Sequence, residues 1–135
     1  MPEETIKELL KQPDRKTYVG VRDYALILLS LDTGIRPSEA LALIPDNFDA
    51  RNLTVFVSAE ISKARVARIL PILPQTAEAL QKLIYNRHRD WDHSVPLFCN
   101  QDGGQLLGRT WSRRLAYYGR QIGAKISPYQ LRHTF

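Results

Sequence analysis

The sequence has few of the features that mark exported or membrane proteins. Cys99 is the single cysteine among 135 residues, so no disulfide can form within the chain, and the apolar stretch VPLFC around it predicts a small buried side chain. The first residues, MPEETIKELL, are acidic and amphipathic, unlike a signal peptide, and no apolar run reaches membrane-spanning length. We therefore expect a soluble, cytoplasmic protein without a membrane partner.

Internal repeats, low-complexity tracts and flexible linkers are also missing, which predicts a single domain over residues 1–135. A composition of 44% hydrophobic and 24% charged residues is typical of a globular chain with a core of its own. Nineteen basic residues against fourteen acidic ones give a net charge of +5. This balance favours a polyanionic partner such as DNA, although many basic domains bind nothing anionic.

Apolar periodicity and helix-boundary residues predict that most of the chain is helical. The expected helices cover residues 3–12, 21–34, 37–43, 74–87 and 109–122, and another one begins after Ser127. Residues 53–57 and 67–72 are predicted to form two β-strands joined by a basic segment. The expected fold class is α+β, mostly helical with a small antiparallel sheet.

The helix predicted over residues 109–122 has two different faces at 3.6 residues per turn. The face expected to join the core carries Trp111, Leu115, Tyr118 and Ile122. The opposite face is a basic stripe of Arg109, Arg113 and Arg120. For an isolated helix a charged stripe is usually a solvated surface, so it becomes a candidate DNA contact only together with other cationic sites.

Arg36 lies at a junction between two predicted helices. Gly34 is expected to end one helix and Pro37 to begin the next, so the backbone of Arg36 should be extended and its side chain aimed by both helices. Glu39, three residues on, is placed to pair with Arg36 and fix its direction. A structural salt bridge at a helix start is the alternative interpretation.

Arg132 lies in another helix start. Ser127 and Gln130 fit a capping box, and Pro128 suits the first helical position, so Tyr129 and Arg132 should lie one turn apart on the same face. A phenol hydroxyl and a guanidinium group are therefore expected to point the same way.

The tip of the predicted hairpin is also cationic. Lys63 lies there, with Arg65 and Arg68 close by in sequence. Charges at this place can simply keep an exposed hairpin soluble. Like Arg36 and Arg132, however, Lys63 is at a turn and not on a regular amphipathic face.

Together these segments resemble the catalytic domain of the tyrosine recombinase, or phage integrase, family. The family's motifs are matched by TGIRPSEAL (residues 33–41), SKARVARILP (residues 62–71) and YQLRHTF (residues 129–135). They occur in the family order with suitable spacing, and the resemblance covers nearly the whole chain. The alternative is a set of unrelated structural arginines and lysines.

The resemblance implies cleavage of a DNA phosphodiester by a tyrosine hydroxyl, through a 3′-phosphotyrosyl intermediate and without a metal or other cofactor. Arg36 and Arg132 would hold the phosphate, which gains negative charge in the transition state. Lys63 would protonate the leaving 5′-oxygen. Glu39 would orient Arg36, and His133 would support the site. The implied DNA-binding residues are Arg65, Arg68, Arg109, Arg113 and Arg120.

Two features depart from the family pattern. Tyr129 occupies the position of the family's usual histidine base, and a phenol with a pKa of about 10 is a poor base at neutral pH, so we expect it to do little more than hydrogen-bond the phosphate. The family's nucleophilic tyrosine follows the segment that ends at Phe135, and its amino-terminal arm has no counterpart. We therefore expect a truncated catalytic domain, inactive alone, with weak and salt-dependent DNA binding.

The expected function is thus site-specific DNA recombination, by integration or excision, with double-stranded DNA as partner and self-association on DNA in the full-length protein. A non-catalytic DNA-binding or interaction module that retains the fold is the alternative. A type IB topoisomerase also cleaves DNA through a tyrosine, but the sequence of the TGIRPSEAL segment favours an integrase. His88 and His93 lie five apart among aspartates, yet no metal site is expected, because charges at a helix end and loop are usually solvated.

Overall fold

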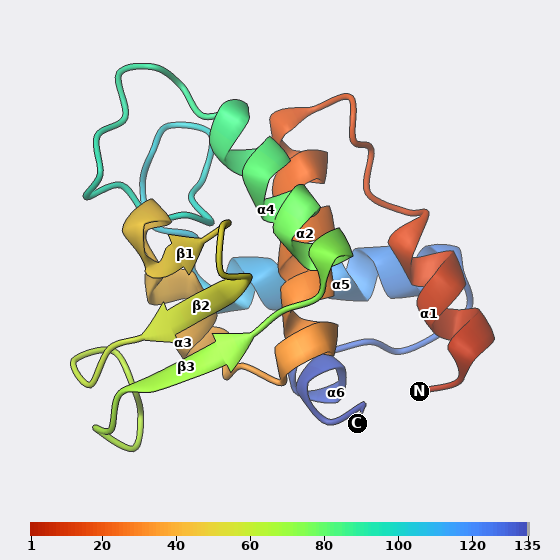
Figure 1. Cartoon of the computed structure of the whole chain (residues 1–135). Coiled ribbons are helices and arrows are strands. Elements are labelled where there is room, and N and C mark those ends of the chain that lie inside the picture. Colours follow the sequence, from red (N-terminus) through yellow and green to blue (C-terminus); the bar gives the residue numbers. More distant parts are fainter. Residues whose placement is uncertain (135) are drawn as a thin grey trace.

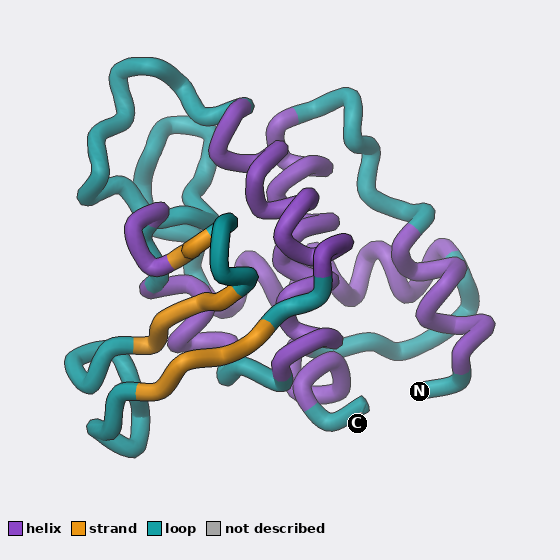
Figure 2. Tube along the Cα trace, viewed as in Figure 1, coloured by secondary structure: helices purple, strands orange, loops and turns teal. Residues whose placement is uncertain are grey.

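The computed structural model describes residues 1–134 and confirms the expected fold class (Figures 1 and 2). The helices of residues 1–134 are α1 (Glu3–Leu10), α2 (Tyr18–Thr33), α3 (Pro37–Ala42), α4 (Pro74–Tyr85), α5 (Gly108–Gln121) and α6 (Pro128–Arg132), with a 3-10 turn η1 (Pro45–Asn47). The strands are β1 (Phe48–Asp49), β2 (Thr54–Val57) and β3 (Arg68–Pro71).

The α2 helix is the centre of the fold. Its residues 25–29 are buried on every side, and α1, α3, α4 and α6 all pack against it. In Figure 1, α4 lies in front of α2, α5 crosses behind it, and α6 lies at its lower end. The helix begins before Val21, the expected start, because the Thr17 hydroxyl accepts a hydrogen bond from the N–H of Gly20 and caps the first turn. It ends at Gly34, as predicted.

The sheet is antiparallel in the order β1-β2-β3. The predicted hairpin is present, with Val55 opposite Leu70 and Phe56 opposite Ile69. Val55 is fully buried, whereas Phe56 on the other face is 42% exposed. The sequence did not predict the β1 strand, because a strand of two residues is too short to show a periodic pattern.

A buried ionic cluster fastens α5 to α2. The Asp23 carboxylate is fully buried and accepts hydrogen bonds from Arg22 Nε (2.9 Å), from the Tyr118 hydroxyl (2.6 Å) and from Arg114 Nε. Arg22, only 3% exposed, also donates through Nη1 to the carbonyl of Cys99 (3.1 Å). Burial, followed by the negative charge of Asp23, raises the pKa of the Tyr118 phenol well above its usual value. The cluster therefore sets the orientation of α5.

The two faces of α5 are arranged as the sequence predicted. Trp111, Leu115 and Tyr118 are buried in the core. The basic stripe of Arg109, Arg113 and Arg120 is exposed. Cys99 is fully buried, in agreement with its apolar surroundings in the sequence. Among residues 1–134, no helix is both long and apolar enough to cross a bilayer.

Candidate DNA phosphate site

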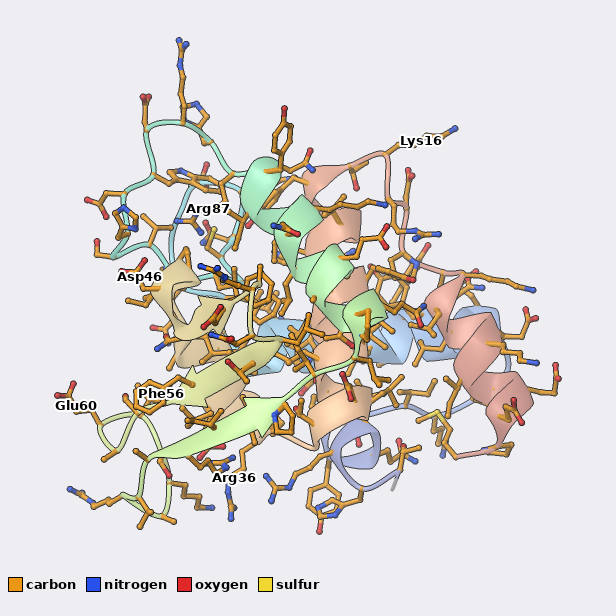
Figure 3. The ribbon with its side chains drawn as sticks, viewed as in Figure 1. Lys16, Arg36, Asp46, Phe56, Glu60 and Arg87 are labelled. Atoms are coloured by element: carbon orange, nitrogen blue, oxygen red, sulfur yellow. The ribbon has the colours of Figure 1, made fainter. Side chains whose placement is uncertain are left out.

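Arg36 lies in an extended connection between α2 and α3, as expected. Its φ and ψ are −66° and 138°, and the left-handed Gly34 before it has a φ of 67°. Figure 3 shows the Arg36 side chain at the lower edge of the molecule, between the β2–β3 hairpin and α6. Within residues 1–134 its polar contacts run through the backbone: its N–H donates to Glu39 Oε1 (3.3 Å) and its carbonyl accepts from Ala40. The guanidinium group is left available.

The Glu39 carboxylate joins α3 to the hairpin. It is fully buried and accepts from Arg68 Nη2 (2.7 Å), Arg68 Nη1 (3.1 Å) and the N–H of Lys63 (3.0 Å). The expected side-chain pairing of Glu39 with Arg36 is therefore wrong, since only the Arg36 N–H reaches the carboxylate. The Arg68 guanidinium group donates to both carboxylate oxygens and is the ion-pair partner of Glu39 in place of Arg36.

Hydrogen bonding keeps Glu39 ionised. Burial by itself would raise the pKa of this carboxyl group, but the hydrogen bonds from Arg68 and from the Lys63 and Arg36 backbones, with the Arg68 charge, lower the pKa to about 2. The hydrogen bond to Glu39 raises the pKa of the Arg68 guanidinium group. Glu39 takes two of the five N–H donors of Arg68, and the side chain is 35% exposed, so the expected contact of Arg68 with DNA stays a prediction.

The hairpin loop presents two cations to solvent. Its turns are closed by bonds from the Ser62 N–H to the Ser58 carbonyl (2.9 Å) and from the Arg65 N–H to the Ser62 carbonyl (3.0 Å). Arg65 has a positive φ of 57°, and the side chains of Lys63 and Arg65 are exposed. The Ser62 hydroxyl is buried without a hydrogen-bond partner among residues 1–134. Because Glu39 holds the Lys63 backbone, the lysine projects from a fixed point.

Arg132 is held by α6, whose capping box is present as predicted. The Ser127 N–H donates to Gln130 Oε1 (2.8 Å), and the Gln130 N–H donates to the Ser127 hydroxyl (3.4 Å). The helix packs on α2 and α3, close to the turn that carries Arg36. Within residues 1–134, Arg132 Nη1 is buried and has no hydrogen-bond partner. A buried guanidinium nitrogen in this state favours an anionic ligand.

Tyr129 and Arg132 share α6 but not the same environment. Tyr129 is 68% exposed, while Arg132 has one buried nitrogen. The expectation that both groups point the same way stays a prediction. The Tyr129 ring packs against His133 at a tilt of 46°, with ring centroids 4.2 Å apart. His133 therefore packs beside Tyr129.

The cations of α5 are divided between its two ends. Arg109 and Arg113 lie in its first turns, beside an open cavity whose lining includes Pro37 and Tyr129. Arg120 follows Arg113 by seven residues, about 10 Å further along the helix axis. The fold thus brings Arg109 and Arg113 toward the segments that carry Arg36 and Arg132, and places Arg120 at the far end.

Comparison with known proteins identifies the family. The sequence model of the phage integrase family matches residues 1–135. The chain belongs to the phage integrase family. Tyrosine recombinase XerC of Chlamydia caviae is 30% identical over 135 residues, which cover 97% of this chain and 42% of XerC. The chain thus spans somewhat less than half of this integrase-family relative.

Solved structures share the fold. The crystal structure of XerA recombinase has a TM-score of 0.80 at 24% identity and covers all of this chain, which corresponds to 46% of XerA. XerH site-specific recombinase, bound to its difH substrate in a pre-cleavage complex, has a TM-score of 0.79 at 23% identity, over all of this chain and 40% of XerH. At these identities the likeness establishes the fold of this integrase-family chain.

The histidines of the 88–93 loop have separate partners in this integrase-family chain. His88 Nδ1 lies 3.7 Å from an Asp90 oxygen, and His93 Nδ1 lies 3.1 Å from Asp46 Oδ1. In the part of the chain that the structure describes, residues 1–134, no three His, Cys, Asp or Glu side chains gather closely enough to share a metal ion.

Gly34 connects the positions of the two arginines. A Cβ atom at Gly34 would lie 3.3 Å from the carbonyl oxygen of Arg132, and the φ of 67° is unfavourable for any other residue. We expect Gly34→Ala to lower the free energy of unfolding by about 1–2 kcal/mol through the left-handed backbone, and also to displace Arg132 and weaken DNA binding. Urea unfolding and fluorescence anisotropy with a labelled duplex measure the two effects.

Gly123 provides the control for this substitution. It has a similar φ of 72°, but a Cβ atom there would meet nothing within 4 Å. Gly123→Ala should lose similar stability and bind DNA as the wild type does. Equal DNA binding by the two variants would contradict a role for the close approach of Gly34 to Arg132.

Proposed function

We propose that this chain is the catalytic-domain part of a site-specific tyrosine recombinase, and that Arg36 and Arg132 hold the DNA phosphate that is attacked. The observation that carries the proposal is the buried, unpartnered Nη1 of Arg132 within residues 1–134, in a helix that packs beside the turn bearing the available guanidinium of Arg36. Two guanidinium groups stabilise the pentavalent transition state more than the ground state, because negative charge on the phosphoryl oxygens increases.

Lys63 suits the general acid of this reaction. As a tyrosine oxygen bonds to phosphorus, the bond to the 5′-oxygen breaks, and the Lys63 ammonium gives its proton to that oxygen. The bond between the Lys63 N–H and Glu39 fixes the point from which the side chain projects. Tyr129 would donate a hydrogen bond to the phosphate, with His133 packed against it. Arg65 would contact the DNA backbone beside Lys63.

The nucleophilic tyrosine and an arm that grips the opposite side of the DNA are proposed to lie in parts of the full-length protein outside these 135 residues. The relatives are longer than the chain, and the XerH structure is of a recombinase on its DNA substrate. We propose integration or excision at a specific site in cytoplasmic DNA, with self-association of the full-length protein on that DNA. Arg109, Arg113 and Arg120 would supply further phosphate contacts, which makes binding salt-dependent.

The arginine assignment predicts a loss of DNA binding in two variants. Arg36→Ala and Arg132→Ala should each weaken binding of a fluorescent duplex by about tenfold or more at low salt, the worth of one charge-assisted contact. Arg51→Ala, which removes an exposed charge elsewhere, is the control. Binding by the two variants as tight as that of Arg51→Ala would refute the assignment.

A longer protein that includes the downstream tyrosine separates the recombinase from a non-catalytic binding module. With a nicked duplex that traps the covalent intermediate, the wild type should form a protein–DNA adduct, while Arg36→Ala and Arg132→Ala should not. DNA binding without any adduct from the wild type would favour the binding module.

A further inference from the structure

An apolar pocket opens beside Arg36, where α3, α5 and α6 begin. Its volume is about 580 Å³, and its apolar lining comes from Pro37, Leu41, Leu106, Leu107, Pro128 and Tyr129. The three helices pack on one another around it. The pocket therefore lies on the same part of the molecule as the two arginines proposed to hold phosphate.

Two side chains on the walls of this pocket are unusually exposed for their type. Leu107 is 45% exposed and Tyr129 is 68% exposed. Beside them, a Cβ atom at Gly108 would meet nothing within 4 Å, so the first turn of α5 is open to solvent. Single exposed apolar residues are common, but two on the walls of one pocket indicate a binding surface.

The residues that flank the pocket are cationic. Arg36 directly precedes Pro37, Arg109 follows Gly108, and Arg113 follows Ser112. Within residues 1–134 none of these three arginines takes part in an ion pair. An apolar pocket with unpaired arginines next to its lining residues fits a polyanion that also exposes apolar groups. Duplex DNA is such a partner, since its phosphates flank grooves in which each thymine exposes a methyl group.

We propose that Leu107 and Tyr129 contact the 5-methyl group of a thymine close to the phosphate held by Arg36 and Arg132, so that this pocket reads one base of the target site. The inference rests on the proposed function, because it requires DNA on this face. Residues at the start of a helix commonly reach base edges, and apolar side chains distinguish thymine by its methyl group. Ser38 and Ser112 supply hydroxyls at the rim for the adjoining backbone.

The test compares thymine with deoxyuridine, which lacks only the methyl group. Duplexes bound by the wild-type chain are selected from a random pool at low salt, and one selected duplex is resynthesised with deoxyuridine at each thymine in turn. At one position the change should weaken binding about fourfold, the worth of one buried methyl group. Leu107→Ala should bind the thymine and deoxyuridine duplexes equally. Discrimination that persists in Leu107→Ala, or its absence at every position in the wild type, would overturn the proposal.

Four further measurements show whether the thymine preference depends on this pocket. Leu73→Ala removes another exposed leucine, which is 59% exposed at the start of α4, and should leave the thymine preference unchanged. Unfolding in urea should have the same midpoint for Leu107→Ala as for the wild type, and Tyr129→Ala should reduce the preference independently. Arg36→Ala should weaken binding to both duplexes alike. If Arg36→Ala weakens binding but the wild type shows no thymine preference, the proposed base contact is wrong while the proposed phosphate site is still supported.

Discussion

Asp23→Ala is expected to lower the free energy of unfolding by about 3–5 kcal/mol, the usual effect of removing one partner from a buried ion pair. The Asp23 carboxylate is the common acceptor for Arg22, Arg114 and Tyr118. Arg22 is only 3% exposed, so without Asp23 its charge would stay buried, and among residues 1–134 the Cys99 carbonyl would be its one remaining acceptor. Urea unfolding followed by circular dichroism at neutral pH measures the loss.

Glu78→Ala is the matched control for Asp23→Ala. Glu78 pairs with Lys82 on α4, but both side chains are largely exposed, at 69% and 65%. An exposed pair of this kind contributes about 0–1 kcal/mol. Asp23→Asn, which keeps the size of the side chain but not its charge, should also lose most of the stability. An Asp23→Ala protein as stable as Glu78→Ala would show that the cluster does not hold α5 to α2.

Glu39→Gln is expected to cost about 2–3 kcal/mol, because it removes a charged acceptor from Arg68 while that side chain keeps partial access to water. Arg68 is 35% exposed and the Glu39 carboxylate is fully buried. The loss should also loosen the Lys63 backbone, whose N–H donates to the same carboxylate. Under the proposed function, DNA cleavage by the full-length protein should therefore fall more than DNA binding does. Urea unfolding and single-turnover cleavage measure the two effects.

The pH dependence of the stability difference between the wild type and Glu39→Gln tests whether the charged Glu39 carboxylate is the source of that difference. The pKa of Glu39 is lowered to about 2 in the folded chain, against about 4.3 for an unperturbed glutamate. Its stabilisation is therefore present above about pH 4.3 and declines as the pH falls toward about 2. The wild type and Glu39→Gln should converge in stability over that range. Glu60→Gln, an exposed change in the same hairpin loop, should match the wild type throughout; a constant difference for Glu39→Gln would contradict the role of its charge.

Local signals explain how much of the fold the sequence could predict. Gly34 ends α2 in a left-handed conformation, and Ser127 and Gln130 form the expected capping box. These features depend on neighbouring residues and can be identified without tertiary structure. The start of α2 was missed because the Thr17 cap lies outside its apolar run. The same local signals placed Arg36 in an extended turn and Arg132 in a short helix.

The contacts between distant segments could not be predicted in this way. Glu39 was expected to pair with Arg36, its neighbour in sequence, but it pairs with Arg68 across 29 residues. Asp23 meets Arg114 across 91 residues. The adjacent Arg22 and Asp23 at the start of an apolar helix indicate a buried charge pair, yet nothing local identifies the third partner. Such pairings follow from how the helices and the hairpin pack.

The packing of α6 on α2 has a consequence for protein synthesis. Arg132 reaches its place beside Gly34 only when α6 docks on α2, a helix that the ribosome makes well before α6. A nascent chain that has folded α1 to α5 therefore presents Arg36 without its partner arginine. Under the proposed function, a ribosome-bound intermediate cannot hold the phosphate with both arginines until α6 has left the ribosome and docked.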